Sequence, residues 1–371
     1  MNSIFSDETF VHRIALTLID GVGDVLARQL ISYCGGVEAV FKEKKRALEK
    51  IPEIGPKTAA AIASFKNFDR AEKELLFTRK HGINLYFYLD EDYPARLKNC
   101  HDAPILLYFK GTADLNHQRM VAIVGTRNAT EYGKEFTIKL VEGLAQMKAT
   151  VVSGLAYGID VTAHKACLLT DVPTIGVMAH GLDRIYPQVH NLIARKMVTT
   201  GGLITEHISG ADPDKENFPK RNRIIAGLCD AVIVVEAAKK GGALITADIA
   251  NSYNRDVFAL PGRINDSFSE GCNMLIKSNR AALIQSVADI KYIMGWDDEK
   301  NGGKTVQKQL FVELSPDEKV LVDFISSNAN SQIDAIVINS GMQPSKVASL
   351  LLNLEFAGVV KCLPGKVFQI L

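Results

Sequence analysis

The chain has 371 residues, of which 47% are hydrophobic and 23% charged, and its formal net charge is +1. This composition is that of a soluble globular protein, and at about 150 residues per domain the length predicts two or three domains. The near-neutral balance excludes attraction of the whole chain to a polyanion, so a nucleic acid would have to be bound by a local cluster of cations.

Several classes of protein do not fit the sequence. It has neither a signal-peptide pattern nor the roughly 20 consecutive apolar residues of a membrane span, so we expect a cytoplasmic protein without a membrane partner. The six cysteines form no CxxC pair, and the eight histidines form no HxH or HExxH motif. We therefore expect neither a disulfide framework nor a metal site.

Residues 1–80 are predicted to be helical and contain two similar stretches, Leu16–Ile31 and Leu48–Phe65. Each has an apolar residue, a tight glycine-containing turn and an amphipathic helix, which resembles a tandem helix-hairpin-helix. Glycine permits a positive φ and leaves N–H groups at the helix start that can hold a phosphate. Asp20, Asp24 and Glu53 flank the turns and would repel phosphate, so a packing or protein-contact module is favoured over a DNA contact.

The central part of the chain alternates apolar runs with amphipathic helical segments such as 133–147, 158–169 and 243–254. This alternation is typical of a parallel sheet covered on both faces. It predicts an α/β, doubly wound Rossmann-like domain at residues 81–294, in which 81–119 is a connector that adds strands or packs on the sheet. The predicted parallel strands are 120–125, 150–154, 174–179, 202–206, 231–237, 256–262 and 281–284.

The loops after these strands are rich in glycine, hydroxyl and guanidinium groups. GTRN follows the first strand, SGLAYGID the second, AHGLD the third and KKGGA the fifth. Ligands of such folds bind at the carboxyl ends of the strands, where helix starts supply N–H donors for phosphates. These loops are therefore predicted to form one phosphate-binding edge, although each glycine alone could equally serve a tight turn.

The most cationic loop follows the fourth predicted strand. Cations beside an aromatic ring suit a phosphate chain that carries bases, and a solvated basic helix face is the alternative. Some of these cations are expected to pair with Glu206 or Glu236, which end strands and are interpreted as holding an arginine. The members of this basic segment are Lys215, Phe218, Lys220, Arg221, Asn222 and Arg223.

Features of an enzyme are weak at the same edge. GTRNATEYG is not a GxGxxG fingerprint, and no GxxxxGK[ST] motif is present, so no nucleotide cofactor is expected. Asp160 and His164 lie four residues apart and could form an acid/base pair. Because no nucleophile or paired carboxylate accompanies them, we interpret Asp160 as starting a helix and His164 as packing on the sheet.

Seven segments in order resemble the DNA-processing protein A (DprA/Smf) family. They are VAIVGTRNATEYG, VVSGLAYGIDVTAHKACL, GLDRIYPQVHN, GGLITEH, FPKRNRIIAGL, VIVVEAAKKGGALITADIA and VFALPGRINDSFSEGCNMLI. The likeness runs from about Tyr93 to Leu283. It implies a non-enzymatic cytoplasmic protein of natural transformation, which protects incoming single-stranded DNA, loads RecA recombinase onto it and acts as a homodimer.

The resemblance also implies the residues that bind single-stranded DNA, among which Lys215, Phe218 and Arg221 are the favoured set. Three departures stand out: Ala179-His180-Gly181 replaces a glycine pair, residues 240–243 replace a Ser-Gly-Ser, and residues 278–281 replace a Gly-Ala where the family makes its dimer and RecA contacts. The implied set is Gly125, Thr126, Arg127, Ser153, Gly154, Lys215, Phe218, Lys220, Arg221, Asn222, Arg223, Gly241 and Gly242.

The C-terminal part is predicted to be a winged helix at residues 313–371, after a polar linker at 295–312. Ser315-Pro316-Asp317-Glu318 has the pattern of a helix start. Helical segments at 317–327, 331–340 and 344–357 precede a hairpin that turns at Pro364-Gly365. Only Lys346 is basic in the third helix, so protein contact or weak backbone contact is favoured over reading of a major groove.

Two other functions stay open at this point. A phosphoribohydrolase of the lysine-decarboxylase-like type shares the Rossmann plan, but PGRINDSFSEG and KKGGALITADIA do not match its PGGxGTxxE signature. A nucleotide-sensing regulator would bind nucleotides without turnover. Binding of single-stranded DNA through its backbone would instead give little sequence preference and a steep dependence on salt.

Overall fold

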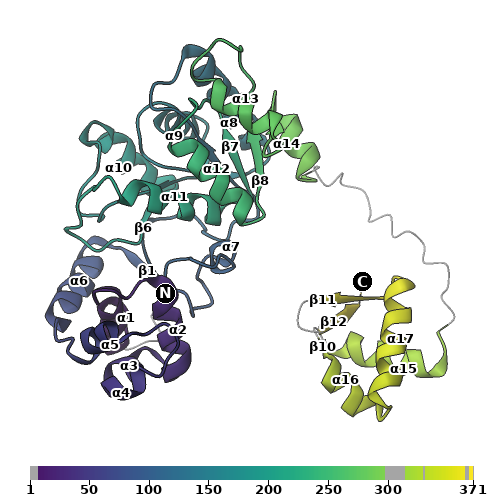
Figure 1. The fold of residues 1–371 in the computed structure, drawn as a ribbon. Helices are drawn as coiled ribbons and strands as arrows, with labels where there is room; N and C mark the ends of the chain where they lie inside the picture. The colour runs from purple at the N-terminus through teal and green to yellow at the C-terminus, as the bar shows by residue number, and fades with distance from the viewer. Residues whose placement is uncertain (1–6, 297–313, 329–330, 364–366, 371) are drawn as a thin grey trace. The chain divides into compact units, whose positions relative to one another are not determined.

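The computed structural model describes residues 7–296, 314–328, 331–363 and 367–370, and the chain divides into two compact units, residues 1–298 and 299–371 (Figure 1). The first unit contains the N-terminal helices and the large sheet, and the second contains the C-terminal helices. The predicted linker lies outside the described residues from residue 297 onward, as does the predicted hairpin turn at Pro364-Gly365.

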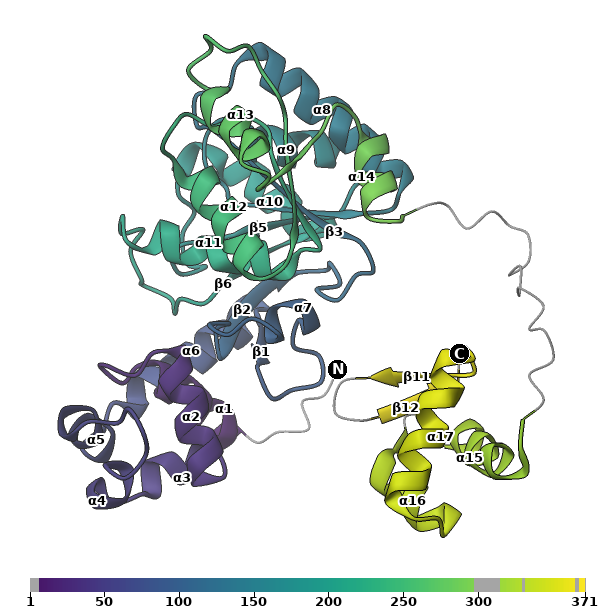
Figure 2. The same cartoon turned by 45° about the vertical axis from the view of Figure 1, so that its right-hand side comes forward.

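The N-terminal helices form a group beside β1 and β2 (Figure 2). Helices α1 and α2 flank the first predicted turn, where Gly21 has a φ of 79°, and α4 and α5 flank the second. Both predicted helix–turn–helix repeats are therefore present. The helices are α1 (Asp7–Thr17), α2 (Asp24–Cys34), α3 (Val37–Lys42), α4 (Lys45–Leu48), α5 (Pro56–Ala63) and α6 (Phe68–His81).

This helical group shares a hydrophobic core with the start of the sheet. Phe87, Ile105, Leu106 and Tyr108 pack in the same cluster as the buried side chains of α1 to α6. The helices and the sheet therefore belong to one compact unit, and the boundary predicted at residue 80 falls at the end of α6.

The described part of the large sheet has the strand order β1-β2-β6-β5-β4-β3-β7-β8-β9. Strands β3 to β9 are parallel and coincide with the predicted strands. The connector adds β1 and β2, which pair antiparallel with each other and with β6. The strands are β1 (Asn84–Phe87), β2 (Leu106–Gly111), β3 (Met120–Val124), β4 (Thr150–Ser153), β5 (Thr174–Val177), β6 (Gly202–Thr205), β7 (Ala231–Val234), β8 (Asp256–Ala259) and β9 (Ala282–Leu283).

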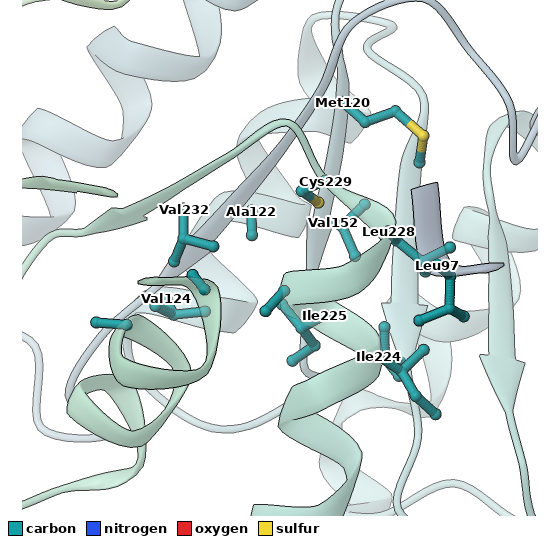
Figure 3. Packing of buried hydrophobic residues seen from close by; sticks show 14 of the residues in the cluster. Leu97, Met120, Ala122, Val124, Val152, Ile224, Ile225, Leu228, Cys229 and Val232 are labelled. Atoms are coloured by element: carbon teal, nitrogen blue, oxygen red, sulfur yellow. The ribbon is translucent and has the colours of Figure 1, made fainter. Parts of the chain in front are cut away.

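Successive residues of the central strands face opposite cores, because side chains alternate along a strand. Val121 and Ile123 pack in the core beneath α8 and α9, whereas Ala122 and Val124 pack against α11 and α12. Figure 3 shows the second core, where Ile225 of α11 lies among these strand side chains. The predicted doubly wound α/β fold is confirmed.

Helices cover both faces of the sheet. On the first face are α8 (Glu131–Gln146), α9 (Ile159–Leu169), α10 (Asn191–Thr200), which follows the short 3-10 helix η1 (Gln188–His190), and α14 (Val287–Ile293). On the second face are α7 (Ala95–Lys98), α11 (Asn217–Leu228), α12 (Gly242–Ser252) and α13 (Glu270–Lys277).

The C-terminal unit is the predicted winged helix, with α15 (Pro316–Ser327), β10 (Ser331–Gln332), α16 (Ile333–Ser340), α17 (Pro344–Phe356), β11 (Val360–Leu363) and β12 (Val367–Ile370). A capping box starts α15: Glu318 N donates to Ser315 Oγ at 3.3 Å, and Ser315 N donates to the Glu318 carboxylate at 2.9 Å. Lys346 of α17 pairs with Asp317 at 2.6 Å, so its charge is engaged within the unit.

Within the described ranges, no helix combines the length and apolar character that a bilayer crossing requires. The same residues contain no group of three or more His, Cys, Asp and Glu side chains arranged to hold a metal ion.

Candidate nucleic-acid interface

The carboxyl ends of β3 to β9 lie at one edge of the sheet, because these strands are parallel. The chain runs from β3 through β4 and β5 to β6 on one side and then continues with β7 on the other side of β3. Such a reversal opens a crevice outside the strand ends, where doubly wound folds bind their ligands.

A pocket opens at this edge, between the loops that follow β3, β4 and β5 and the start of α11. Three aromatic rings, two arginines and a histidine supply most of its chemistry, together with apolar side chains such as Leu155 and Met178. The polar and aromatic members are Arg127, Tyr157, His180, Tyr186, Phe218 and Arg221.

The rim of the pocket is aromatic and cationic. The Arg127 guanidinium lies 5.7 Å from the centre of the Phe218 ring, and the centre of the Tyr186 ring lies 6.0 Å from the same ring centre. Tyr157 and Tyr186 are 52% and 51% exposed. Exposed rings offer stacking surfaces, and an arginine next to them can pair with a phosphate.

The floor of the pocket contains Arg221, which is only 6% exposed. Its Nη1 donates to Val177 O, and its guanidinium lies near Asp160. Burial lowers the pKa of Arg221 to about 10, and the Asp160 carboxylate partly offsets this. The arginine therefore keeps its charge at neutral pH, and the same arginine opposes the rise in the pKa of Asp160 that burial causes.

The absence of a side chain at Gly154 leaves room for the buried Arg221 guanidinium. A Cβ at Gly154 would lie 2.5 Å from Asp160 Oδ2 and 2.7 Å from Arg221 Nη2. The residue before it, Ser153, is fully buried, and its hydroxyl donates to Ile123 O at 2.6 Å. Ser153 and Gly154, both predicted to contact DNA, are thus buried in this structure, and Arg221 and Asp160 fill the space beside Gly154.

The side chains of the basic segment have different surroundings: some are exposed, and others make contacts within the fold. It forms the start of α11, where Pro219 is tolerated because first-turn N–H groups have no partner within the helix. Lys215 and Lys220 are exposed, and Lys220 lies 4.0 Å from Glu216. Asn222 donates to Gly242 O at 3.3 Å and thereby ties α11 to the start of α12.

Arg223 points away from the pocket toward the N-terminal helices. It pairs with Asp24 at 3.0 Å and more closely with Glu206, and it donates to Asp102 O. The prediction that an arginine of this segment meets Glu206 is confirmed. Burial raises the pKa of Glu206 to about 7, which Asp24 reinforces and Arg223 opposes. The guanidinium of Arg223, which is predicted to contact DNA, is engaged inside the fold in this structure.

Glu236 is predicted to hold an arginine, but in the structure its carboxylate binds Thr130 instead. Its carboxylate accepts hydrogen bonds from Thr130 N at 2.9 Å and from Thr130 Oγ1 at 2.5 Å. A Cβ at Gly133 would lie 2.5 Å from this carboxylate. Glu236 therefore fixes the start of α8, where a carboxylate also complements the helix dipole, and it pairs with no arginine in the described ranges.

The turn after β3 is held against α9 by backbone contacts. Thr126 N donates to Glu236 O at 2.7 Å, and Ile159 N donates to Thr126 O at 3.2 Å. Gly158 has a φ of 77°, and a Cβ there would overlap Thr126 O. Gly125 is needed for packing, because a Cβ would lie 2.5 Å from the Ile159 side chain. These contacts leave the Arg127 side chain exposed.

The start of α12 is open to ligands. Gly241 and Gly242 are exposed, and no atom of a described residue lies within 4 Å of a Cβ built on Gly241. They share the carboxyl-end edge with the pocket but do not line it.

The predicted packing of His164 against the sheet is confirmed, and Asp160 lies in the first turn of α9. His164 is fully buried, with Nε2 2.5 Å from Gly154 O and Nδ1 2.7 Å from Thr174 Oγ1. Because a carbonyl only accepts, Nε2 carries the proton and Nδ1 accepts from the hydroxyl. Burial lowers the pKa of His164 to about 4, so the ring is neutral at physiological pH.

Three residues that line the pocket, Tyr157, His180 and Tyr186, are absent from the predicted binding set. Tyr157 and His180 lie in loops predicted to form the carboxyl-end edge, so their position after a strand is the signal that could have identified them. Tyr186 lies farther along its loop, and only the folded path of the chain brings its ring to Phe218.

The fold and this edge define an α/β protein of the Rossmann-like class with an N-terminal helical region and a C-terminal winged helix. The family model of DNA recombination-mediator protein A matches residues 84–294, and that of the DprA winged helix domain matches residues 309–366. The chain therefore belongs to the DNA recombination-mediator protein A family.

Relatives support this assignment over most of the chain. The putative DNA processing protein DprA of Mycobacterium tuberculosis is 32% identical over 350 residues, which cover 91% of this chain and 88% of the relative. The DNA processing protein DprA of Streptococcus pneumoniae is 43% identical over 202 residues, which cover 54% of this chain and 71% of the relative.

Two solved structures are similar as well. The X-ray structure of DNA processing protein A from Streptococcus pneumoniae matches with a TM-score of 0.67 and 33% identity, over 76% of this chain and 97% of that one. DNA processing protein A from Helicobacter pylori, whose structure concerns its single-stranded DNA binding mode, matches with a TM-score of 0.52 and 31% identity, over 57% of this chain and 95% of that one.

Proposed function

We propose that this protein binds single-stranded DNA at the carboxyl-end edge of its sheet and acts as a recombination mediator that protects the strand and loads RecA recombinase onto it. The observation that carries the proposal is the rim of the pocket, where Arg127 and the rings of Tyr157, Tyr186 and Phe218 lie together. Exposed rings accept bases of any sequence, and the cation holds a phosphate.

Further cations lie near the rim of the pocket and could bind neighbouring phosphates of the strand. Lys215 and Lys220 are exposed beside Phe218 along the chain, and the N–H groups at the start of α12 lie on the same edge. A helix start carries partial positive charge and free donors, which favours a phosphate there. The proposed contact set is Arg127, Lys215, Phe218, Lys220, Gly241 and Gly242, with Thr126 and Asn222 positioning two of the loops.

The proposed function involves no catalysed reaction. Three carboxylates near this edge are engaged in the fold: Asp160 lies beside Arg221, Glu206 pairs with Arg223, and Glu236 accepts from Thr130. Among the described residues that line the pocket, none is a carboxylate. Incubation with nucleoside monophosphates should release no free base, and release of base by the purified protein would point to a phosphoribohydrolase.

Binding is tested by titrating oligothymidine at 50 and 200 mM salt, the range over which electrostatic binding weakens most visibly. With three exposed cations on phosphates, the slope of log K against log salt should be about −2, at about −0.7 per phosphate. Arg127→Ala should weaken binding and reduce the magnitude of the slope by about 0.7. Phe218→Ala should weaken binding by about 1–3 kcal/mol while leaving the slope unchanged.

The matched control is Lys139→Ala, which removes one exposed positive charge from the middle of α8, on the opposite face of the sheet from α11. Its affinity and slope should equal those of the unmodified protein. Unchanged affinity of both Arg127→Ala and Phe218→Ala would refute the proposed site.

The RecA contact and the homodimer belong to the same proposal and rest on family membership. Loading predicts that the protein accelerates RecA filament formation on single-stranded DNA. A homodimer predicts twice the monomer mass in sedimentation equilibrium.

A further inference from the structure

His180 contributes a buried imidazole to the lining of the pocket. It follows β5, the residue is 1% exposed, and it lines the pocket together with Arg221. Its Nδ1 lies 2.8 Å from Gly181 O. Because the carbonyl can only accept, Nδ1 carries the proton, and in the neutral ring Nε2 therefore offers a lone pair.

This lone pair has no partner among the residues that the structure describes. His180 Nε2 is buried and makes no hydrogen bond with any described residue. Burial lowers the pKa of His180, so the ring stays neutral at physiological pH. A buried acceptor without a partner is costly in a folded protein, and its presence points to an occupant that donates a hydrogen bond.

Arg221, another residue that lines the pocket, carries a donor for which the described part of the chain offers no partner. Arg221 Nε is buried and makes no hydrogen bond with any described residue, although Nη1 of the same side chain donates to Val177 O. Two residues of the pocket lining thus carry one acceptor and one donor without a described partner, and both atoms lie below the accessible surface of the pocket in this structure.

This combination fits a nucleobase better than a phosphate. Phosphate oxygens only accept, so a phosphate would face the His180 lone pair without a hydrogen bond. The Watson–Crick edge of a base instead carries an N–H donor next to an acceptor, and single-stranded bases are commonly bound through this edge while they stack on aromatic or arginine side chains.

We propose that the pocket takes up one base of the bound strand edge-on, with His180 Nε2 accepting a hydrogen bond from an N–H of that base and Arg221 Nε donating to the neighbouring acceptor. Phe218 and Tyr186 then flank the base, and Arg127 holds the adjacent phosphate at the rim. The inference rests on the proposed binding of single-stranded DNA and adds the group that contacts the base edge.

The test uses oligothymidine in which every thymine is methylated at N3. This methyl group removes the N–H but leaves the phosphates and most of the stacking surface, and full substitution prevents the strand from shifting register to an unmodified base. The unmodified protein should bind the methylated strand about tenfold more weakly than plain oligothymidine, the cost of one unmet buried hydrogen bond.

The His180→Ala variant should bind both strands with equal affinity, because the acceptor is gone. His180→Gln should recover part of the discrimination, since its amide oxygen can accept the same hydrogen bond. The thermal unfolding midpoint of each variant checks that the fold is retained.

Two negative results are distinguishable. If the unmodified protein binds both strands equally while Arg127→Ala and Phe218→Ala still weaken binding, the base contact is refuted and the proposed function stands. If the unmodified protein binds neither strand, the proposed function fails as well. Discrimination that persists in His180→Ala would also overturn the role of this residue.

Discussion

At the scale of single residues, burial decides which charged groups can act outside the fold. Arg221 and Arg223 are two residues apart, yet one forms the pocket floor and the other pairs with Asp24 and Glu206. Arg127, Lys215 and Lys220 keep exposed cations. The cations with freedom to meet a phosphate are therefore fewer than the cations in the sequence.

The buried neutral His164 predicts a dependence of stability on pH. Its pKa falls from 6.5 in the unfolded chain to about 4 in the fold. Between these values the unfolded chain binds the proton and the fold does not, so stability declines as the pH falls from 6.5 toward 4. From pH 7 to pH 5 this group should lower the free energy of unfolding by about 2 kcal/mol.

Glu206 acts in the opposite direction over the same range, because burial raises its pKa from 4.5 to about 7 and the fold holds the proton more tightly. The measurement is therefore the difference in urea unfolding free energy between the unmodified protein and His164→Gln. This difference should shrink by about 2 kcal/mol from pH 7 to pH 5. An equal difference at both pH values would contradict a neutral buried ring.

At the scale of elements, the contact between the β3 turn and the start of α9 positions Arg127. Gly158→Ala would place a Cβ against Thr126 O on a backbone with a φ of 77°. Strain and overlap together should cost about 2–4 kcal/mol of stability and should also weaken DNA binding through displacement of Arg127.

Gly241→Ala is the matched control for this substitution. Its φ is 171°, an extended conformation that any residue adopts, and no atom lies within 4 Å of the added Cβ. Its unfolding free energy, measured by urea denaturation, should stay within about 0.5 kcal/mol of the unmodified protein. Equal losses in both variants would show that the close contact at Gly158 has no special importance.

The strands and helices were predictable from the sequence, and much of the site was not. Continuous apolar runs identified β3 to β9, and the capping pattern identified the start of α15, because these signals are local. The surroundings of Arg223 depend on α2, which contributes Asp24 from far along the chain. Likewise, the local sequence at Gly154 predicts a phosphate-binding turn, because only the folded chain brings Arg221 and Asp160 beside it.

At the scale of the whole molecule, the net charge is near zero, but paired and exposed cations lie in different places. Asp24 and Glu206 neutralise Arg223 where the N-terminal helices meet the sheet, while Arg127, Lys215 and Lys220 remain exposed at the carboxyl-end edge. The helical region shares a core with β1 and β2 and so supports that edge within one unit. Local potential, rather than net charge, then attracts the strand.

The most direct test of this account locates the strand on the protein. An oligothymidine that carries photoreactive 4-thiothymine is bound, irradiated and digested, and the crosslinked peptides are identified by mass spectrometry. The account predicts crosslinks in peptides that contain Phe218, Tyr157 or Tyr186. Crosslinks confined to the winged helix at residues 315–370 or to α1–α6, with none in these loops, would contradict binding at the carboxyl-end edge of the sheet.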